Sequence, residues 1–301
     1  MNPLTETGRD TIPIILNARA GATHASVGRD HLRKMAREIG FIADVQETYS
    51  AEQMRETVRR FVRAGIPRIG IAGGDGTIRA AVQELAHSET ALGILPQGTF
   101  NNFATALRLP QNLPAALKTL YRGCVCPVDL GRIGELYFTE SAGIGLFADG
   151  LAFLGEEHQK NLFRAFATAI RLATRMRVAR VRLTIDGETE ELPMVLCEVA
   201  NTYRIGAGLP IAPDAEVSDG HFNLVVIGDI KRRELMEYMN AVRAQLHPDL
   251  PGVRMLKAAR SVRIETRRPR NVHCDDTVLG VTPVTVSMEA GALKVLVDET
   301  R

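Results

Sequence analysis

The sequence predicts an α/β fold followed by a β fold, with an N-terminal, doubly wound parallel α/β domain and a C-terminal antiparallel β domain. Over residues 1–126, short apolar runs alternate with segments whose apolar residues recur three and four positions apart, as strands alternate with helices. Over residues 127–301, short or alternating apolar runs are separated by Asp-Gly, Pro and Gly, as in antiparallel strands. We take 1–126 and 127–301 as the two domains and leave open a return of the last residues to the first.

The composition limits the functions that the chain can have. Its 301 residues carry a net charge of +2, with 5% aromatic residues and no Trp, which disfavours nucleic acid as a partner. The four cysteines are scattered without zinc-ligand spacing, so reduced thiols are expected. The N-terminus lacks the apolar core of a signal peptide, and no stretch reaches the roughly 20 apolar residues of a membrane span. We therefore expect a cytoplasmic protein.

The strands of the first domain bring several polar residues to one edge of the sheet. Strands are expected at residues 12–16, 41–48, 69–72 and 91–95. The first helix is expected to end at Gly40 with a left-handed cap, and Ser50 with Gln53 forms a capping box for the second. Ligands of such sheets bind beyond the carboxyl ends of the strands, where this chain has Asn17, Thr48 and the loops 73–77 and 98–102.

The loop that follows the third strand has the strongest functional signal. Gly73, Gly74 and Gly76 lie within four residues, so backbone amides can approach a ligand without a Cβ in the way, and phosphate is the expected ligand. Asp75 would repel a bare phosphate, which argues for a cation, a protonated partner or a hydroxyl to be activated nearby. This combination favours phosphoryl transfer. The alternative is a simple strand-to-helix turn in which Asp75 caps the helix.

The second domain has less specific signals. Strands are indicated around residues 137–138, 181–185, 192–199, 222–227, 262–264 and 284–288, and helices around 151–175 and 233–246. A cleft between the two domains would suit a second substrate. Between Lys160 and Arg182 there are seven basic residues and no acid. That segment would suit contact with an anionic membrane, and the alternative is an ordinary amphipathic helix packed on the domain.

Three motifs carry a family resemblance. They are Gly73-Gly74-Asp75-Gly76-Thr77, the run from Pro96 to Ala104 that contains Gly98-Thr99-Phe100-Asn101, and Ile211-Ala212-Pro213-Asp214-Ala215 followed by Ser218-Asp219-Gly220. In this order and spacing they resemble the diacylglycerol kinase and sphingosine kinase family, most closely its bacterial soluble lipid kinases. The resemblance implies a nucleotide-binding domain followed by a β-sandwich, with ATP and a lipid meeting in the cleft.

The resemblance also implies roles for particular residues. It places the nucleotide near Asn17, Thr48, Gly73, Gly74, Gly76, Thr77, Gly98, Thr99 and Asn101. It places Asp75 close to the reacting phosphate and hydroxyl. In bacterial relatives Mg²⁺ sits at the late Asp-Gly motif, which here falls on Asp219, with backbone oxygens of Glu216 and His221 as further ligands. The alternative for Asp219 is a hairpin turn residue before Gly220.

Two positions depart from the family pattern. Asn102 stands where many relatives carry Asp, so a charge is missing there while hydrogen bonding survives. The chain reads Asp275-Asp276-Thr277 where bacterial relatives read Asp-Gly-Glu, whose Glu is proposed as the proton acceptor, and a neutral Thr cannot accept that proton. The remaining candidates for the base are Asp75, Asp275 and Asp276. We favour Asp75, assisted by Asp275, although the two adjacent carboxylates would equally suit a solvated loop or a cation site.

These observations lead to three functional hypotheses. The first is an ATP- and Mg²⁺-dependent kinase for a hydroxyl of a diacylglycerol-like or sphingoid lipid, working at the inner membrane surface. The second is a NAD kinase-like enzyme, although the Asn-Glu pair expected there is absent from this sequence. The third is a nucleotide- or lipid-binding protein impaired in catalysis by Thr277. The sequence determines neither the lipid nor the oligomeric state, and a homodimer is compatible with it.

Overall fold

The computed structural model describes residues 11–18, 28–158 and 178–298, with the backbone alone for 154–158. The chain divides into two compact units. Unit 1 comprises Met1–Val128 and Gly291–Arg301, and unit 2 comprises Asp129–Ala290. Two strands, β5 (Cys124–Ile133) and β16 (Val284–Val297), run from one unit into the other. The C-terminal end of the chain therefore belongs to the same unit as its N-terminal part.

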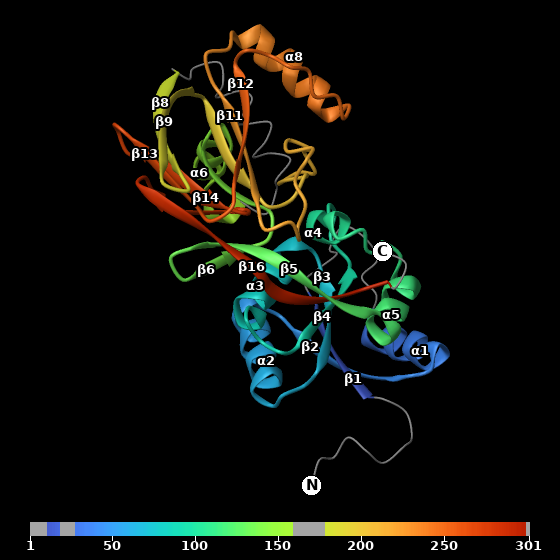
Figure 1. The fold of residues 1–301 in the computed structure, drawn as a ribbon. Coiled ribbons are helices and arrows are strands. Elements are labelled where there is room, and N and C mark those ends of the chain that lie inside the picture. Colours follow the sequence, from blue (N-terminus) through green and yellow to red (C-terminus); the bar gives the residue numbers. More distant parts are fainter. Residues whose placement is uncertain (1–10, 19–27, 159–177, 299–301) are drawn as a thin grey trace. The chain divides into compact units, whose positions relative to one another are not determined.

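A parallel sheet forms the centre of unit 1 (Figure 1). Its strands lie in the order β2, β1, β3, β4, and the end of β16 joins beside β4 through the parallel pair Val295 and Leu92. The bounds are β1 Thr11–Asn17, β2 Ile42–Thr48, β3 Arg68–Gly73 and β4 Ala91–Pro96. Because these strands pair in parallel, their carboxyl ends share one edge of the sheet.

Helices cover both faces of this sheet, which makes it doubly wound (Figure 1). On one side α1 (Arg29–Ile39) contacts α5 (Leu113–Arg122), and on the other α2 (Ala51–Arg63) contacts α3 (Asp75–Leu85). Short α4 (Asn102–Ala106) follows β4. Gly40 ends α1 with a φ of +118°, and Ser50 Oγ accepts a hydrogen bond from Gln53 N at 3.1 Å at the start of α2. The Gly40 and Ser50 caps are thus confirmed, whereas Gln53 Oε1 accepts from Tyr49 N at 2.8 Å, one residue before the Ser50 N of the predicted capping box.

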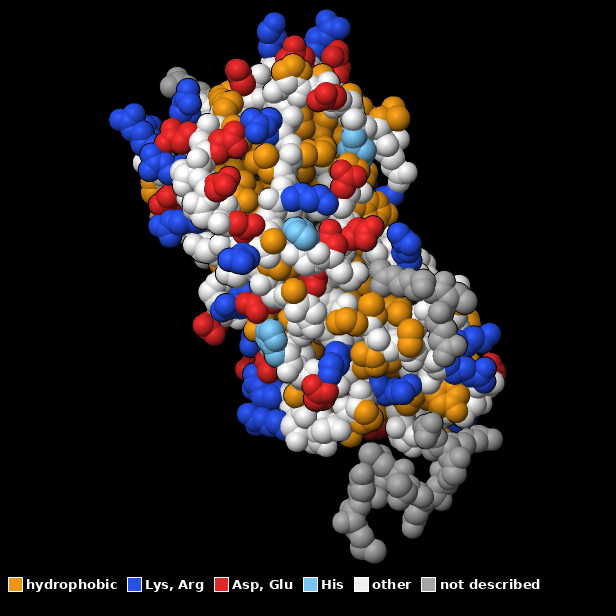
Figure 2. Space-filling model, viewed as in Figure 1, with side chains coloured by type: hydrophobic (Ala, Val, Ile, Leu, Met, Phe, Trp, Pro, Cys, Tyr) orange, Lys and Arg blue, Asp and Glu red, His pale blue; other side chains and the backbone are white. Residues whose placement is uncertain are grey.

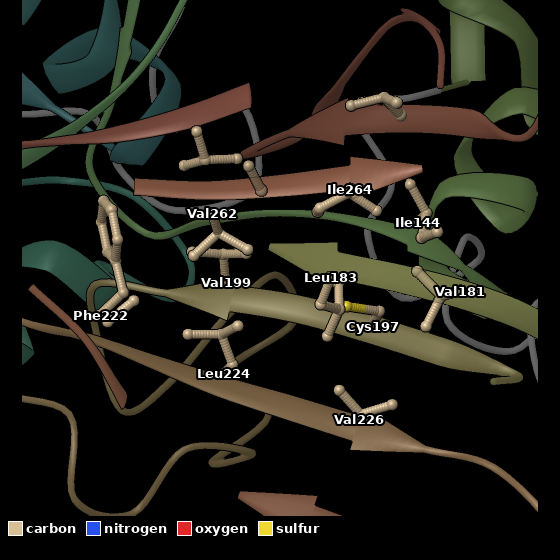
Figure 3. Close-up of a cluster of buried hydrophobic side chains, with 14 of the residues drawn as sticks. Ile144, Val181, Leu183, Cys197, Val199, Phe222, Leu224, Val226, Val262 and Ile264 are labelled. Atoms are coloured by element: carbon tan, nitrogen blue, oxygen red, sulfur yellow. The ribbon is translucent and has the colours of Figure 1, made fainter. Parts of the chain in front are cut away.

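Unit 2 consists of two antiparallel sheets packed face to face. One has the order β16, β13, β8, β9, and the other β12, β11, β10, β7, β14, β15. The bounds are β7 Ser141–Gly145, β8 Ala179–Ile185, β9 Glu188–Met194, β10 Leu196–Ala200, β11 Phe222–Ile227, β12 Val253–Ala258, β13 Ser261–Thr266, β14 Asn271–Cys274 and β15 Thr277–Val281; β6 (Leu136–Phe138) pairs with β5. Apolar side chains of β8 and β13 lie beside those of β7, β10 and β11 in the core between the sheets (Figure 3). The predicted fold class is confirmed.

The outer face of the six-stranded sheet carries a second apolar cluster. Successive side chains of a strand point to opposite faces, so Cys197 and Val199 of β10 enter the sandwich core while Leu196 and Ala200 face outward. Helix α6 (Leu146–His158) covers this outer face with Phe147 and Leu151, and α8 (Arg232–Arg243) adds Leu235, Tyr238 and Val242. A side chain that points outward from β10 or β14 toward α6 is therefore buried between the sheet and the helix.

Two details of unit 2 differ from the sequence-based expectation. The apolar run at residues 192–199 is two strands in different sheets, because the chain changes sheet at Val195, whose N–H donates to Ile227 O at 2.7 Å. The helix expected at 151–175 begins earlier, at Leu146, and residues 159–177 lie outside the described residues. Most of the basic segment from Lys160 lies there too. Arg180 and Arg182 lie on β8, where Arg182 pairs with Glu191 at 2.6 Å.

Charge is mixed on the molecular surface. On the face shown in Figure 2, Lys and Arg side chains are interspersed with Asp and Glu in both units. This agrees with the small net charge of +2. Among the helices of the described part of the chain, none is long and apolar enough to cross a bilayer.

Candidate active site

Two loops at the carboxyl edge of the unit 1 sheet approach each other at backbone distance. Strand β3 ends at Gly73 and α3 begins at Asp75, with Gly74 as its N-cap in extended conformation. A Cβ on Gly74 would lie 2.9 Å from Gly98 Cα, and one on Gly73 would lie 2.5 Å from Thr77 Cβ. Real Cβ atoms essentially never come this close to their neighbours, so the sequence needs glycine at both positions. The close contacts with Gly98 and Thr77 thus explain why the predicted loop has glycine at positions 73 and 74.

The loop after β4 is closed by one asparagine. Asn101 has a left-handed backbone with φ +50°, and its Oδ1 accepts a hydrogen bond from Gly98 N at 2.9 Å while its Nδ2 donates to Gly98 O at 3.1 Å. Gln97 N donates to Gly73 O at 3.0 Å, which ties this loop to the glycine loop. Asparagine suits both the left-handed conformation and the local hydrogen bonds. Thr99 is exposed at the tip.

The ends of β1 and β2 complete this edge of the sheet. Asn17 Nδ2 donates to Thr77 Oγ1 at 2.8 Å, which joins the end of β1 to the first turn of α3. Ala18 N donates to Thr48 O at 2.9 Å, and the buried Thr48 hydroxyl donates to Leu16 O at 3.4 Å. The structure thus brings Asn17, Thr77 and Thr48 to one edge of unit 1, together with the two glycine loops.

Asp75 holds a position that a helix cap would not require. The N-cap of α3 is Gly74, whereas the half-buried Asp75 is the first helical residue. Its Oδ1 accepts a hydrogen bond from Phe103 N, in the first turn of α4, at 3.2 Å. Phe103 N of the neighbouring loop therefore helps to orient the carboxylate, and Asp75 is not the N-cap residue of its own helix. A carboxylate fixed in this way at a glycine-rich phosphate loop can orient or deprotonate a hydroxyl.

In unit 2, the turn between β14 and β15 is held by the Asp275 carboxylate. Asp275 is buried, with a left-handed φ of +49°. Its Oδ2 accepts hydrogen bonds from Thr139 N and Thr139 Oγ1, and its Oδ1 accepts from Glu140 N and Ser141 N, at 2.9 to 3.3 Å. Four donors thus surround this carboxylate, which anchors the turn to the chain entering β7. Asp276 is more exposed and accepts from Thr277 Oγ1 at 3.3 Å.

The Asp219 loop gathers carboxylate and backbone oxygens. Asp219 Oδ1 accepts from His221 N at 2.9 Å, and His221 Nδ1 lies 2.7 Å from Asp219 O. A second carboxylate meets the loop, because Asp129 Oδ2 accepts from Gly220 N at 2.7 Å. In the described ranges no three His, Cys, Asp or Glu side chains gather as a metal cluster. Because Mg²⁺ binds few protein carboxylates and keeps several waters, Asp219 with nearby backbone oxygens fits such an ion without a larger cluster.

The sequence-based interpretation missed Asp129. It lies on β5 inside a run of otherwise uncharged residues, Pro127 to Gly131, and it is buried. A buried charged residue within a strand requires hydrogen bonds, and its contact with Gly220 is one of them. The lone acid between Val128 and Leu130 was the available signal.

The chain resembles known proteins over nearly its whole described length. Residues 11–133 match the diacylglycerol kinase catalytic domain, and residues 155–297 match the YegS C-terminal NAD kinase β-sandwich-like domain. A diacylglycerol kinase of Mycobacterium tuberculosis is 29% identical over 255 residues, which is 82% of each chain. A YegS-like lipid kinase homologue of Pseudomonas putida is 30% identical over 195 residues, 64% of this chain and 66% of that protein.

Solved structures share the fold. A crystal structure of a diacylglycerol kinase from Bacillus anthracis has a TM-score of 0.73 and 22% identity, and the comparison covers 98% of this chain and 99% of that chain. At this identity the likeness establishes the fold. The two matching domains, over residues 11–133 and 155–297, show that the chain belongs to the family of bacterial diacylglycerol kinase and YegS-like lipid kinase homologues.

Proposed function

We propose that the protein transfers the γ-phosphoryl group of ATP to a hydroxyl of a diacylglycerol-like or sphingoid lipid. The observation that carries the proposal is the pair of glycine loops in unit 1, with Gly74 against Gly98 and Asp75 oriented by Phe103 N. Membership of the family supports a lipid kinase that uses ATP. The identity of the lipid whose hydroxyl accepts the phosphoryl group is our own proposal.

Several residues of unit 1 have separate roles in the proposed binding of the nucleotide. Backbone amides at the start of α3 and small side chains such as Thr77 suit phosphate oxygens, and Asn17 holds the Thr77 hydroxyl in place. Bound Mg²⁺ would neutralise charge on the phosphate oxygens. Glycine at positions 73, 74 and 98 lets the loops approach the nucleotide at backbone distance. Positioning of this kind supplies most of the acceleration in phosphoryl transfer.

Asp75 is the proposed proton acceptor. Phe103 N helps to orient it, and it takes the proton of the lipid hydroxyl at a carboxylate oxygen as the new O–P bond forms and the bond from the γ-phosphorus to ADP breaks. Asp275 assists by holding the turn after β14 in place, because its carboxylate accepts hydrogen bonds from four donors. The neutral Thr277 side chain cannot accept the proton. The reaction must therefore proceed without a second carboxylate base, as a loose transition state allows. Asp219 and nearby backbone oxygens of Glu216 and His221 are the proposed Mg²⁺ ligands, with Asp129 supporting the loop.

A lipid substrate also implies work at a membrane. The donor nucleotide is water-soluble and the acceptor lies in a bilayer, so we propose a cytoplasmic enzyme that acts at the inner membrane surface. Sedimentation with anionic and neutral vesicles tests this. Binding that requires anionic lipid and weakens with salt supports electrostatic attachment, whereas equal binding to both vesicles contradicts it.

Thin-layer separation of products from labelled ATP tests the reaction itself. The protein is incubated with diacylglycerol, sphingoid base or NAD, and label is expected on one of the two lipids. Label only on NAD would replace the proposal by a NAD kinase-like activity. The same assay with Thr277→Glu addresses the third hypothesis. Activity that appears only in that variant would identify the natural protein as a binding module that lacks its acceptor.

A further inference from the structure

A histidine and a glutamate are paired and fully enclosed in unit 2. Nε2 of His273 lies 3.0 Å from Glu198 Oε1 and 2.9 Å from Oε2, and both side chains are 0% exposed. The two residues sit on β14 and β10, on either side of β7, and both are in register with Gly143. A Cβ on Gly143 would lie 2.6 Å from Glu198 Oε2. The pair therefore lies across a glycine that leaves room for it, beneath Phe147 of α6, whose ring meets the imidazole edge-on at 4.7 Å.

The hydrogen bonds of His273 define its protonation state. The second ring nitrogen, Nδ1, lies 3.0 Å from the backbone oxygen of Asp275. With Glu198 ionised, its carboxylate and the Asp275 carbonyl oxygen both accept hydrogen bonds, so both ring nitrogens donate. A neutral imidazole has a single N–H, and only the imidazolium satisfies both partners. The geometry therefore favours an imidazolium between an ionised Glu198 carboxylate and the Asp275 carbonyl.

The electrostatics of the site agree with this geometry. Burial lowers the pKa of His273, but the Glu198 carboxylate, the hydrogen bonds to Glu198 and to the Asp275 backbone, and the Asp275 carboxylate together raise it more, so the net pKa is raised. Glu198 and Asp275 are the acidic groups that act on it. Apolar residues of similar volume often stabilise a fold as well as a buried ion pair does. Stability alone therefore gives little reason to keep charges at these positions.

The pair holds the turn that follows it. His273 binds the carbonyl of Asp275, and the carboxylate of the same residue binds the amides of residues 139–141. The His273 ring thus fixes the peptide that leads from Asp275 to Asp276, and residues 139–141, at the start of β7, fix the Asp275 side chain. Thr277 begins β15 immediately afterwards.

We propose that His273 and Glu198 are positioning residues for phosphoryl transfer, which fix the Asp275–Thr277 turn in its active conformation through the Asp275 carbonyl. The proposal rests on the lipid kinase function, because it assigns this turn to the reaction. It also has a structural part that does not depend on activity: an imidazolium that clamps one peptide of the turn.

Two substitutions distinguish the hydrogen bond of His273 to the Asp275 carbonyl from its contact with Glu198. His273→Asn places an amide near the former Nδ1 and can still donate to Asp275 O, whereas His273→Gln places an amide near the former Nε2 and can donate only toward Glu198. Both remove the positive charge beside Glu198, and the stability of each variant is measured so that kcat is compared per folded molecule. Tyr238→Phe is the control, because its buried hydroxyl has no hydrogen-bond partner among the described residues.

Kinetics and hydrogen exchange are measured on the full-length variants. We expect His273→Gln to lower kcat about tenfold more than His273→Asn does, with the KM for ATP nearly unchanged, since one hydrogen bond to the Asp275 carbonyl distinguishes the two variants. Amide exchange of residues 275–278 should rise by a similar factor in His273→Gln only. Tyr238→Phe should match the wild type. Equal kcat per folded molecule in the two His273 variants, with equal exchange at the turn, would overturn the proposal.

A spectroscopic measurement on the wild type covers the case in which a variant fails to fold. Nitrogen-15 NMR of the His273 ring should show both nitrogens protonated at pH 7. A ring whose Nδ1 carries no proton at that pH would contradict the clamp, because it could not donate to the Asp275 carbonyl. If the wild type phosphorylates no lipid, the proposed function fails, while ring protonation and exchange at the turn still decide whether His273 holds the turn.

Discussion

A Cβ added to Gly98 would lie 2.6 Å from Gly74 Cα, so the loops after β3 and β4 touch through two residues without side chains. The same added atom would lie 2.7 Å from Asn101 Oδ1, which closes its own loop on Gly98 N. The spacing of the two loops is therefore set by glycine on both sides. Any larger residue must displace backbone or break the Asn101 contact.

The Gly98→Ala variant should raise the KM for ATP at least tenfold and cost about 1–3 kcal/mol of stability, because overpacking here moves backbone. ATP binding and urea unfolding measure the two effects. Gly28→Ser is the control, since a Cβ at Gly28 meets nothing within 4 Å and Ser is favoured at the N-cap of α1. A wild-type KM in the Gly98→Ala variant would show that the close approach of the loops is not needed for the nucleotide.

Asp275 provides a second test, in unit 2. Asp275→Asn replaces one acceptor oxygen by a donor that faces N–H groups of residues 139–141, so we expect a loss of about 1–3 kcal/mol in the free energy of unfolding. Asp276→Asn is the matched control, because Asp276 is more exposed, and its stability should stay within about 0.5 kcal/mol of the wild type. Calorimetry compares them. Equal stability of the two variants would refute the anchoring role of Asp275.

The raised pKa of His273 predicts how stability depends on pH. A histidine whose folded pKa exceeds its ordinary value of 6.5 contributes stability that is fully present below 6.5 and is lost as pH rises through the folded pKa. The difference in unfolding free energy between wild type and His273→Gln should therefore shrink as pH rises above 6.5. Urea unfolding across this pH range measures it. A difference that grows with pH would mean that His273 is neutral in the folded protein.

The sequence predicted features whose causes are local. Gly40 and Ser50 end and begin helices through contacts within four residues, and the glycine loop at residues 73–77 follows directly from an apolar strand. The Gly74–Gly98 approach was only implied, since both loops were expected at one edge of the sheet. Its backbone distance depends on the register of β3 and β4.

The buried polar contacts of unit 2 were not predictable in this way. Glu198 and His273 are 75 positions apart and meet only because β7 lies between their strands. Asp275 was considered as a base, but its hydrogen bonds go to residues more than 130 positions earlier in the chain. No periodicity in the sequence indicates such partners. A buried acid within an otherwise uncharged run, as at Asp129 between Pro127 and Gly131, is the one local sign that a partner exists.

The Asp75→Asn variant tests the central claim most directly. Asn keeps the shape of the side chain and an acceptor oxygen for Phe103 N, but it removes the charge that accepts the proton. Transfer of label from ATP to lipid is measured together with ATP binding and melting temperature. We predict that transfer falls by at least about a hundredfold, while binding and melting temperature stay close to the wild type. Turnover near the wild-type rate in a folded, ATP-binding Asp75→Asn protein would contradict the account.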